Sequence, residues 1–181
     1  MVIETEKKYR LTHEQREIVL ENLADIGAEY KGEEFEENLL FYGGVLSEKQ
    51  AVLRLRRIGE RTILTFKERV QNDLDIKQHH EYETETADFD ETVKIFESLG
   101  FHRSMVYEKR RKTWHFRSVE IVLDELSFGD FMEIEGSITA IKEAEILLEA
   151  EDFETEHETY PFLTRKFGVK NGYLIEARFE K

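Results

Sequence analysis

Apolar and polar residues alternate with a period of two along much of the chain, which is the pattern of β-strands with one buried face. Residues 2–10 alternate in this way, and residues 51–69 contain two such runs around a turn at Gly59 and Glu60. Alternating runs that flank a short turn form hairpins, so 51–69 is predicted to be one. Further strands are predicted over 36–44, where the strand ends in a glycine turn, and over 79–86, 104–116, 119–126, 131–138 and 172–179.

A period of three to four residues replaces this alternation in segments that are predicted to be helices. The segment 12–28 begins with Thr12 and Gln15, which can form a capping box, and Gly27 ends it. The other predicted helices are 88–100, 139–150 and 159–168, whereas the polar residues 69–78 are predicted to be a loop. The pattern indicates an α+β protein with antiparallel pairing, and the absence of a linker favours a single domain over residues 1–181.

Strand parity separates apolar residues from charged residues in most of these strands. In 51–58, Leu53 and Leu55 lie on the face opposite Arg54 and Arg56. When the same rule is applied to every strand, the charged faces carry residues of both signs. The acidic residues on these faces are Glu4, Glu6, Glu81, Glu83, Glu85, Asp124, Glu133 and Glu135, and the basic residues are Lys8, Arg54, Arg56, Lys67, Lys109 and Arg111.

Two arrangements account for such a face. An ordinary half-exposed sheet would turn the charged side to water and the apolar side to the helices. Alternatively, the sheet closes into a barrel with the charged residues inside, which costs several kcal/mol per ion unless water, metal ions or an anionic ligand offset it. Arginine and lysine suit phosphate oxygens, while carboxylates suit Mg²⁺ or Mn²⁺. A triphosphate with its metal ions would complement both sets, with Glu4 and Glu6 holding a metal and Lys8 facing the phosphate.

The overall composition restricts the partners of the protein. The formal net charge is −14, which disfavours binding to nucleic acids and to anionic membranes. The sequence contains no cysteine, so disulfides and thiolate metal sites are excluded. Its six histidines are scattered along the chain, so a zinc site is not expected. Because neither a signal peptide nor a long apolar run is visible, we expect a cytoplasmic protein.

Several short segments occur in an order that resembles the CYTH superfamily, also called triphosphate tunnel metalloenzymes. Residues 4–8 match the ExExK pattern, and the segments LRLR, TFK, HEYETE, YEKRRKTW and LDELSFGDFMEIE follow up to residue 135. The resemblance implies an α+β fold with a closed eight-stranded antiparallel barrel, the tunnel, and helices packed outside. The neighbourhood of Asn38 and Leu39 departs from the family, because many members have an aspartate there.

The resemblance also implies roles for individual residues. The predicted phosphate-binding residues are Lys8, Arg54, Arg56, Lys67, Lys109 and Arg111, and the first four of these are the predicted catalytic residues. Lys8 is either a phosphate ligand or, if the two arginines lower its pKa, a base. The predicted ligands of Mg²⁺ or Mn²⁺ are Glu4, Glu6, Glu81, Glu83, Asp124, Glu133 and Glu135, with a register uncertainty that could bring in Glu85.

The length of the chain and its EKRR and GDFMEIE segments are most similar to the class IV adenylyl cyclase branch, which converts ATP to cyclic AMP and pyrophosphate. The same residues would serve a triphosphatase acting on inorganic triphosphate, thiamine triphosphate or a nucleoside triphosphate. A polyphosphate-binding module without turnover is a third alternative, although binding alone would not need the acidic residues. The expected partner is a triphosphate small molecule, and the resemblance also suggests a homodimer.

Overall fold

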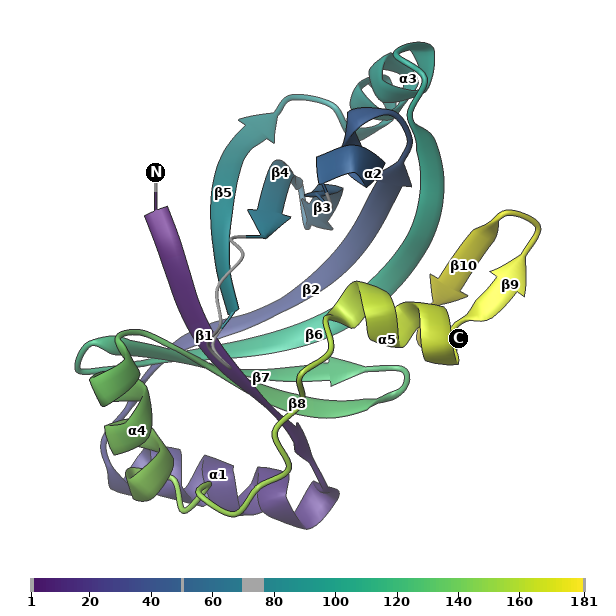
Figure 1. The fold of residues 1–181 in the computed structure, drawn as a ribbon. Helices are drawn as coiled ribbons and strands as arrows, with labels where there is room; N and C mark the ends of the chain where they lie inside the picture. The colour runs from purple at the N-terminus through teal and green to yellow at the C-terminus, as the bar shows by residue number, and fades with distance from the viewer. Residues whose placement is uncertain (1, 50, 70–76, 181) are drawn as a thin grey trace.

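The computed structural model describes residues 2–49, 51–69 and 77–180, and for residues 2–4, 69 and 77–79 it describes the backbone alone. These ranges contain ten strands and five helices (Figure 1). In chain order they are β1 (Val2–Leu11), α1 (His13–Asp25), β2 (Glu29–Tyr42), α2 (Val45–Lys49), β3 (Ala51–Ile58), β4 (Arg61–Arg69), β5 (Lys77–Thr86), α3 (Phe89–Ser98), β6 (His102–Phe116), β7 (Val119–Leu126), β8 (Gly129–Glu135), α4 (Ile138–Leu147), α5 (Tyr160–Phe167), β9 (Val169–Asn171) and β10 (Leu174–Ala177).

The described strands form one strongly curved sheet in the order β2-β3-β4-β5-β1-β8-β7-β6-β10-β9, and β2 pairs additionally with β6. Neighbouring strands are antiparallel except for β10, which runs parallel to β6. Strands β2 and β6 are long, and Figure 1 shows them curving side by side. Their register extends from Glu29 opposite His115 to Tyr42 opposite His102, with two irregularities. Strand β2, at one end of the sheet order, therefore pairs with β6 along most of its length.

The predicted α+β fold with antiparallel pairing is confirmed, including the hairpin of β3 and β4. Its turn contains Gly59 at φ 55°, a backbone conformation that residues with a Cβ atom rarely adopt. Two elements were missed: the short helix α2 and the strand β9, which pairs with β10 in a C-terminal hairpin. The sheet formed by the described residues has ten strands in an order with two ends. The predicted closed barrel of eight strands is therefore not confirmed. Most of the predicted loop 69–78 lies outside the described residues.

Helices α1 and α4 cover one outer region of the sheet, and both begin as the sequence predicts. Thr12 and Gln15 form the expected capping box, and Ser137 caps α4 through its contact with the Ala140 amide. Their apolar residues pack against β1, β7 and β8 in a cluster that includes the fully buried Tyr9 and Ile134. No helix within the described ranges is long and apolar enough to cross a bilayer.

The remaining helices cover two other regions. Helices α2 and α3 pack against the apolar residues of β2, β3 and β6. Helix α5 packs differently, because Tyr160 and Leu163 contact Tyr107 and Phe131. By strand parity, these two sheet residues share a face with Lys109 and Glu133. One end of the charged side of the sheet is therefore apolar and is covered by α5.

Candidate functional site

Strands β1 to β8 direct charged residues to one side of the sheet, which we call the charged face. Its described members are Glu6, Lys8, Glu36, Arg54, Arg56, Lys67, Glu81, Glu83, Lys109, Arg111, Asp124, Glu133 and Glu135. On β3, Leu53 and Leu55 belong to the apolar cluster beneath α2 and α3. Arg54 and Arg56 alternate with these leucines and therefore lie on the opposite face. The sequence-predicted separation of apolar and charged faces is thus present in the structure.

Arg111 on β6 lies at the centre of the charged face. Its Nε and Nη2 atoms donate to the two carboxylate oxygens of Asp124 on β7 over 2.7 and 2.6 Å. Nη2 also donates to Oε2 of Glu133 on β8 over 2.7 Å. The register makes this possible, because Arg111 and Asp124 are directly opposite each other. Burial opposes the charge on Arg111, but Asp124 and Glu133 outweigh it and raise the pKa of the guanidinium well above its usual value.

Lys8 on β1 extends this network to the next strand. Its Nζ atom lies 3.1 Å from Oε1 of Glu133, which is directly opposite in the register of β1 and β8. The same Nζ atom donates to the backbone oxygen of Glu158 over 3.3 Å and lies 3.9 Å from the centre of the Tyr160 ring. Burial would raise the pKa of Glu133, yet Lys8 and Arg111 hold it well below its ordinary value. Glu133 is therefore ionised at neutral pH.

Glu36 on β2 is a buried acid of the charged face that was not predicted. It is 1% exposed, and its Oε2 atom lies 3.4 Å from Lys109 Nζ and 3.3 Å from Arg56 Nε. Burial alone would raise the pKa of Glu36, but Lys109, Arg56 and Arg111 lower it to about 2. Its Oε1 atom is also buried and has no hydrogen-bond partner among the described residues. Parity within 36–42 could have identified it, because Leu39 and Phe41 lie on the opposite face.

Lys109 and Arg56 are the two bases that form ion pairs with Glu36 through its Oε2 atom. Lys109 is 2% exposed and also lies 3.4 Å from Oδ2 of Asp124. Burial and the nearby Arg111 lower the pKa of Lys109 to about 8. Arg56 donates from Nε to Oδ1 of Asn38 over 3.1 Å, and burial with the charge of Arg54 lowers its pKa. Asn38, at the position that departs from the family pattern, thus orients one of the predicted phosphate-binding arginines.

A second group of charged residues lies on β3, β4 and β5. Arg54 donates to the Thr65 hydroxyl over 3.2 Å, and Thr65 donates to Glu83 over 3.1 Å. Lys67 Nζ lies 2.9 Å from Oε2 of Glu81, which is directly opposite it in the register. The predicted metal ligands Glu81 and Glu83 therefore contact a base and a hydroxyl of the neighbouring strand.

Glu6 and Glu135 are directly opposite each other in the register of β1 and β8. Carboxylates on directly opposed positions repel each other, and a divalent cation that both could ligate would remove this repulsion. The predicted partner Glu4 lies on the same face two residues earlier, but its side chain lies outside the described residues. Among the described side chains, no three acidic or histidine residues are grouped as a ready-made metal site. The donor chemistry fits Mg²⁺ or Mn²⁺, which commonly use one or two carboxylates together with phosphate oxygens of a substrate.

The family profile of the CYTH domain matches residues 2–161, which includes every charged residue described above. The chain belongs to the CYTH domain family. Members of this family of triphosphate tunnel metalloenzymes are typically enzymes that act on triphosphate substrates with divalent metal ions. No curated protein matches the chain.

Solved structures resemble this CYTH domain over most of its length. The PH1819 protein of Pyrococcus horikoshii is 25% identical, with a TM-score of 0.73, and the match covers 90% of this chain and 98% of that one. A Vibrio parahaemolyticus protein proposed to be an adenylate cyclase is 21% identical, covers 89% and 97%, and has a TM-score of 0.69. The Hippeastrum protein HpAC1, proposed to be an adenylyl cyclase and found to have a dominant triphosphatase activity, is 16% identical, covers 92% and 96%, and has a TM-score of 0.66.

The charged face of this CYTH domain brings most of the predicted site residues into two contact groups. Lys8, Lys109, Arg111, Asp124 and Glu133 form one group, together with the unpredicted Glu36. Arg54, Lys67 and Glu81 form the other, and Arg56 contacts Glu36 of the first. Because each base is held by an acid, the basic side chains are already oriented before any anion binds. Such an arrangement can grip several phosphate groups in succession.

Proposed function

We propose that the protein is a metal-dependent enzyme that acts on the triphosphate of a nucleotide or a related compound. The observation that carries the proposal is a group of five bases that the three strands β1, β3 and β6 direct to one face, namely Lys8, Arg54, Arg56, Lys109 and Arg111. Each of these bases lies within 4.0 Å of an acid of the same face. An entering polyphosphate would replace the acids as the partner of these bases, so the charges need little rearrangement.

We further propose that strands β1 to β8 enclose this face as a tunnel. The additional pairing of β2 with β6 supports closure, because β2 also pairs with β3 at the other end of the series. Contacts that skip a strand, such as that of Arg54 on β3 with Glu81 on β5 at 4.0 Å, support strong curvature. Partial exclusion of water from such a tunnel would strengthen the attraction between the bases and the phosphate oxygens.

In this proposal the metal ion is Mg²⁺ or Mn²⁺, and the residues that would hold it are Glu4, Glu6 and Glu135, with Glu81, Glu83, Asp124 and Glu133 as further predicted ligands. When bound, it would neutralise phosphate charge and lower the pKa of the attacking hydroxyl or water. Arg54, Arg56, Lys67, Lys109 and Arg111 would bind the β- and γ-phosphates and stabilise the charge of the leaving group. Lys8 would bind the phosphate beside Glu133.

The reaction that we propose first is that of a class IV adenylyl cyclase. The ribose 3′-hydroxyl of ATP releases its proton as its oxygen bonds to the α-phosphorus, the bond from this phosphorus to the bridging oxygen breaks, and pyrophosphate leaves with the bonding electrons. The similarity of the EKRR and GDFMEIE segments to that branch supports it. Triphosphatase activity is the second candidate, because the charged face contacts phosphate groups in either reaction and would also accept an inorganic triphosphate.

Product analysis tests the two candidates directly. The protein is incubated with ATP, GTP, thiamine triphosphate and inorganic triphosphate, with Mg²⁺ or Mn²⁺, and the products are separated by chromatography. Cyclic AMP with pyrophosphate would support the cyclase, whereas orthophosphate would support the hydrolase. Tight triphosphate binding without any product would contradict the proposal of an enzyme and favour a binding module.

Glu6→Gln tests whether the activity uses the predicted metal site. The variant keeps the size of the side chain but removes a carboxylate charge, so we expect the metal-dependent activity to be abolished while the thermal unfolding temperature stays the same. The matched control is Glu21→Gln on the exposed surface of α1, which should retain full activity. Equal activity of the two variants would contradict the assigned site.

A further inference from the structure

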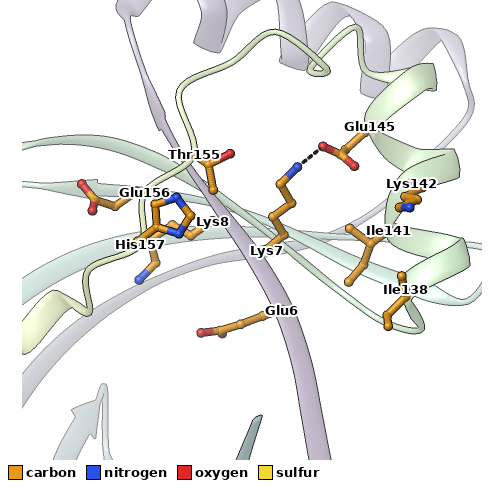
Figure 2. A pocket seen from close by; sticks show the side chains of 10 residues that line it. All are labelled: Glu6, Lys7, Lys8, Ile138, Ile141, Lys142, Glu145, Thr155, Glu156 and His157. Atoms are coloured by element: carbon orange, nitrogen blue, oxygen red, sulfur yellow. Dashed lines mark hydrogen bonds and ion pairs between the residues drawn. The ribbon is translucent and has the colours of Figure 1, made fainter. Parts of the chain in front are cut away.

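A cavity of about 310 Å³ lies beside β1, between α4 and the segment that leads to α5 (Figure 2). It is lined by Glu6 and Lys8 from the charged face, by Ile138 and Ile141 from α4, and by His157 from the segment before α5. Glu6 and Lys8 therefore belong both to the charged face and to the lining of this cavity. None of the activities proposed so far uses the other residues of this cavity.

The backbone pairing of β1 explains why a cavity forms here. Strand β5 pairs with β1 as far as Glu6, which is opposite Lys77. Beyond this point the same edge of β1 pairs with a different segment, because Lys8 accepts from the Glu156 amide over 2.8 Å and Arg10 donates to the Glu154 oxygen over 2.9 Å. The cavity lies where β1 changes its partner, between Glu6 and Lys8.

The cavity reaches from the charged face around the edge of β1 to the side of α4. Figure 2 shows Lys7 directed toward Glu145 on α4, with which it forms an ion pair, while Glu6 and Lys8 extend to the other side of the strand. This follows from strand parity, since Lys7 lies between them in the sequence. A molecule held by Lys8 on the charged face could thus extend over the strand edge toward Ile138 and Ile141.

The far part of the cavity is lined by apolar residues, which suit a flat ring, and also by Lys142. Ile138 is 45% exposed although it lies beside the cavity, and Ile141 forms the wall next to it. The charges of Lys7 and Glu145 neutralise each other, and the exposed imidazole of His157 can stack on a ring. Pockets for small molecules measure about 300–1,000 Å³ and are mainly apolar with a few polar groups, so the volume is sufficient for a heteroaromatic ring.

We propose that this cavity binds the heteroaromatic base of a nucleoside triphosphate whose phosphates occupy the charged face. The inference rests on the proposed function and adds to it the substrate class, because a site for a base distinguishes nucleotides from inorganic triphosphate. Ile138 and Ile141 contact one face of the base, and His157 contacts it from the segment before α5. These residues determine specificity and do not take part in the bond-breaking step.

Two variants test the proposal by the ratio of two dissociation constants, that for ATP and that for inorganic triphosphate, each measured by titration calorimetry. Ile138→Trp fills the cavity, and we expect it to raise the ratio about tenfold. His157→Ala removes the imidazole, and we expect a rise of about threefold. The matched controls are Ile146→Trp, at an exposed position of the same helix that does not line the cavity, and His102→Ala on the exposed part of β6.

The outcomes separate this inference from the function on which it rests. A ratio that rises in both test variants and stays at the wild-type value in both controls supports the base site. If all proteins bind both ligands with the wild-type ratio, the base site is wrong and the triphosphate function stands. If the wild-type protein binds neither ligand, the proposed function is wrong and the base site with it. Thermal unfolding of each variant confirms that it is folded, and His157→Ala changes only an exposed side chain.

Discussion

The hydroxyl of Tyr160 donates a hydrogen bond of 2.7 Å to Oδ2 of Asp124, which joins helix α5 to the centre of the charged face. Both residues are buried, and the Tyr160 ring also lies beneath the ammonium groups of Lys8 at 3.9 Å and Lys109 at 5.4 Å. Burial and the charge of Asp124 raise the pKa of Tyr160 well above its ordinary value, so the phenol remains a donor. Helix α5 is therefore held by polar contacts as well as by its apolar residues.

Tyr160→Phe should lower the free energy of unfolding by about 1–2 kcal/mol, because a buried hydrogen bond to a charged group is lost. The loss stays at this size because Asp124 keeps its contacts with Arg111 and Lys109. Urea denaturation measures the change, and Tyr173→Phe at a 97% exposed position is the matched control. Equal stability of the two variants would show that the hydrogen bond contributes nothing.

Replacing Arg111 should be more severe, since it neutralises two buried acids at once. Arg111→Ala leaves Asp124 and Glu133 with fewer compensating charges, and we expect the free energy of unfolding to fall by about 3–5 kcal/mol. Arg111→Lys retains the charge without the forked donor geometry, so it should recover part of this loss. Denaturation in urea compares the two variants with Arg110→Ala. Arg110 is the next residue of β6, on its exposed side, and its guanidinium pairs with Glu125 on β7.

The periodicity of the strands was sufficient to predict the charged face. Alternation of Leu53 and Leu55 with Arg54 and Arg56 fixes which side of β3 meets the outer cluster, and the structure confirms that separation. Helix positions were also predictable where a local signal exists, as with the capping box of Thr12. These features depend on residues close together in the sequence, which is why the sequence alone reveals them.

Contacts between distant segments were not predictable in the same way. Nothing in the residues 159–168 indicates that Tyr160 reaches Asp124, because this contact depends on where α5 packs on the sheet. The cavity beside β1 depends on the change of pairing partner between Glu6 and Lys8, which no local pattern shows. Glu36 was missed for a different reason: the parity rule applied to its strand would have placed it on the charged face.

Stability in acid should depend on Glu36. Its pKa falls from 4.5 in the unfolded chain to about 2 in the folded protein, where Lys109, Arg56, Arg111 and Arg54 outweigh the effect of burial. The unfolded state then binds more protons than the folded state between pH 4.5 and about 2. The stabilisation by Glu36 is thus complete above pH 4.5, amounts to about 3 kcal/mol, and is lost as the pH falls through that interval.

The measurement compares urea denaturation of wild type and Glu36→Gln at a series of pH values from 7 to 2. We expect the stability difference between the two proteins to be constant at the upper end and to shrink below pH 4.5. Taking this difference removes the contributions that other acids make to both proteins. A difference that does not change with pH would show that Glu36 has the same pKa in both states.

Glu36→Gln should also strengthen the binding of polyphosphate, although it weakens the fold. In the free protein Glu36 occupies Arg56 and Lys109, and both bases would contact an entering triphosphate. Removal of this competing charge lowers the cost of the exchange, and we expect the dissociation constant for inorganic triphosphate to fall about tenfold without added metal. Titration calorimetry measures it, with Glu34→Gln as control, because Glu34 pairs with the exposed Arg61 at 3.0 Å. Weaker binding by Glu36→Gln would mean instead that Glu36 orients these bases more than it competes for them.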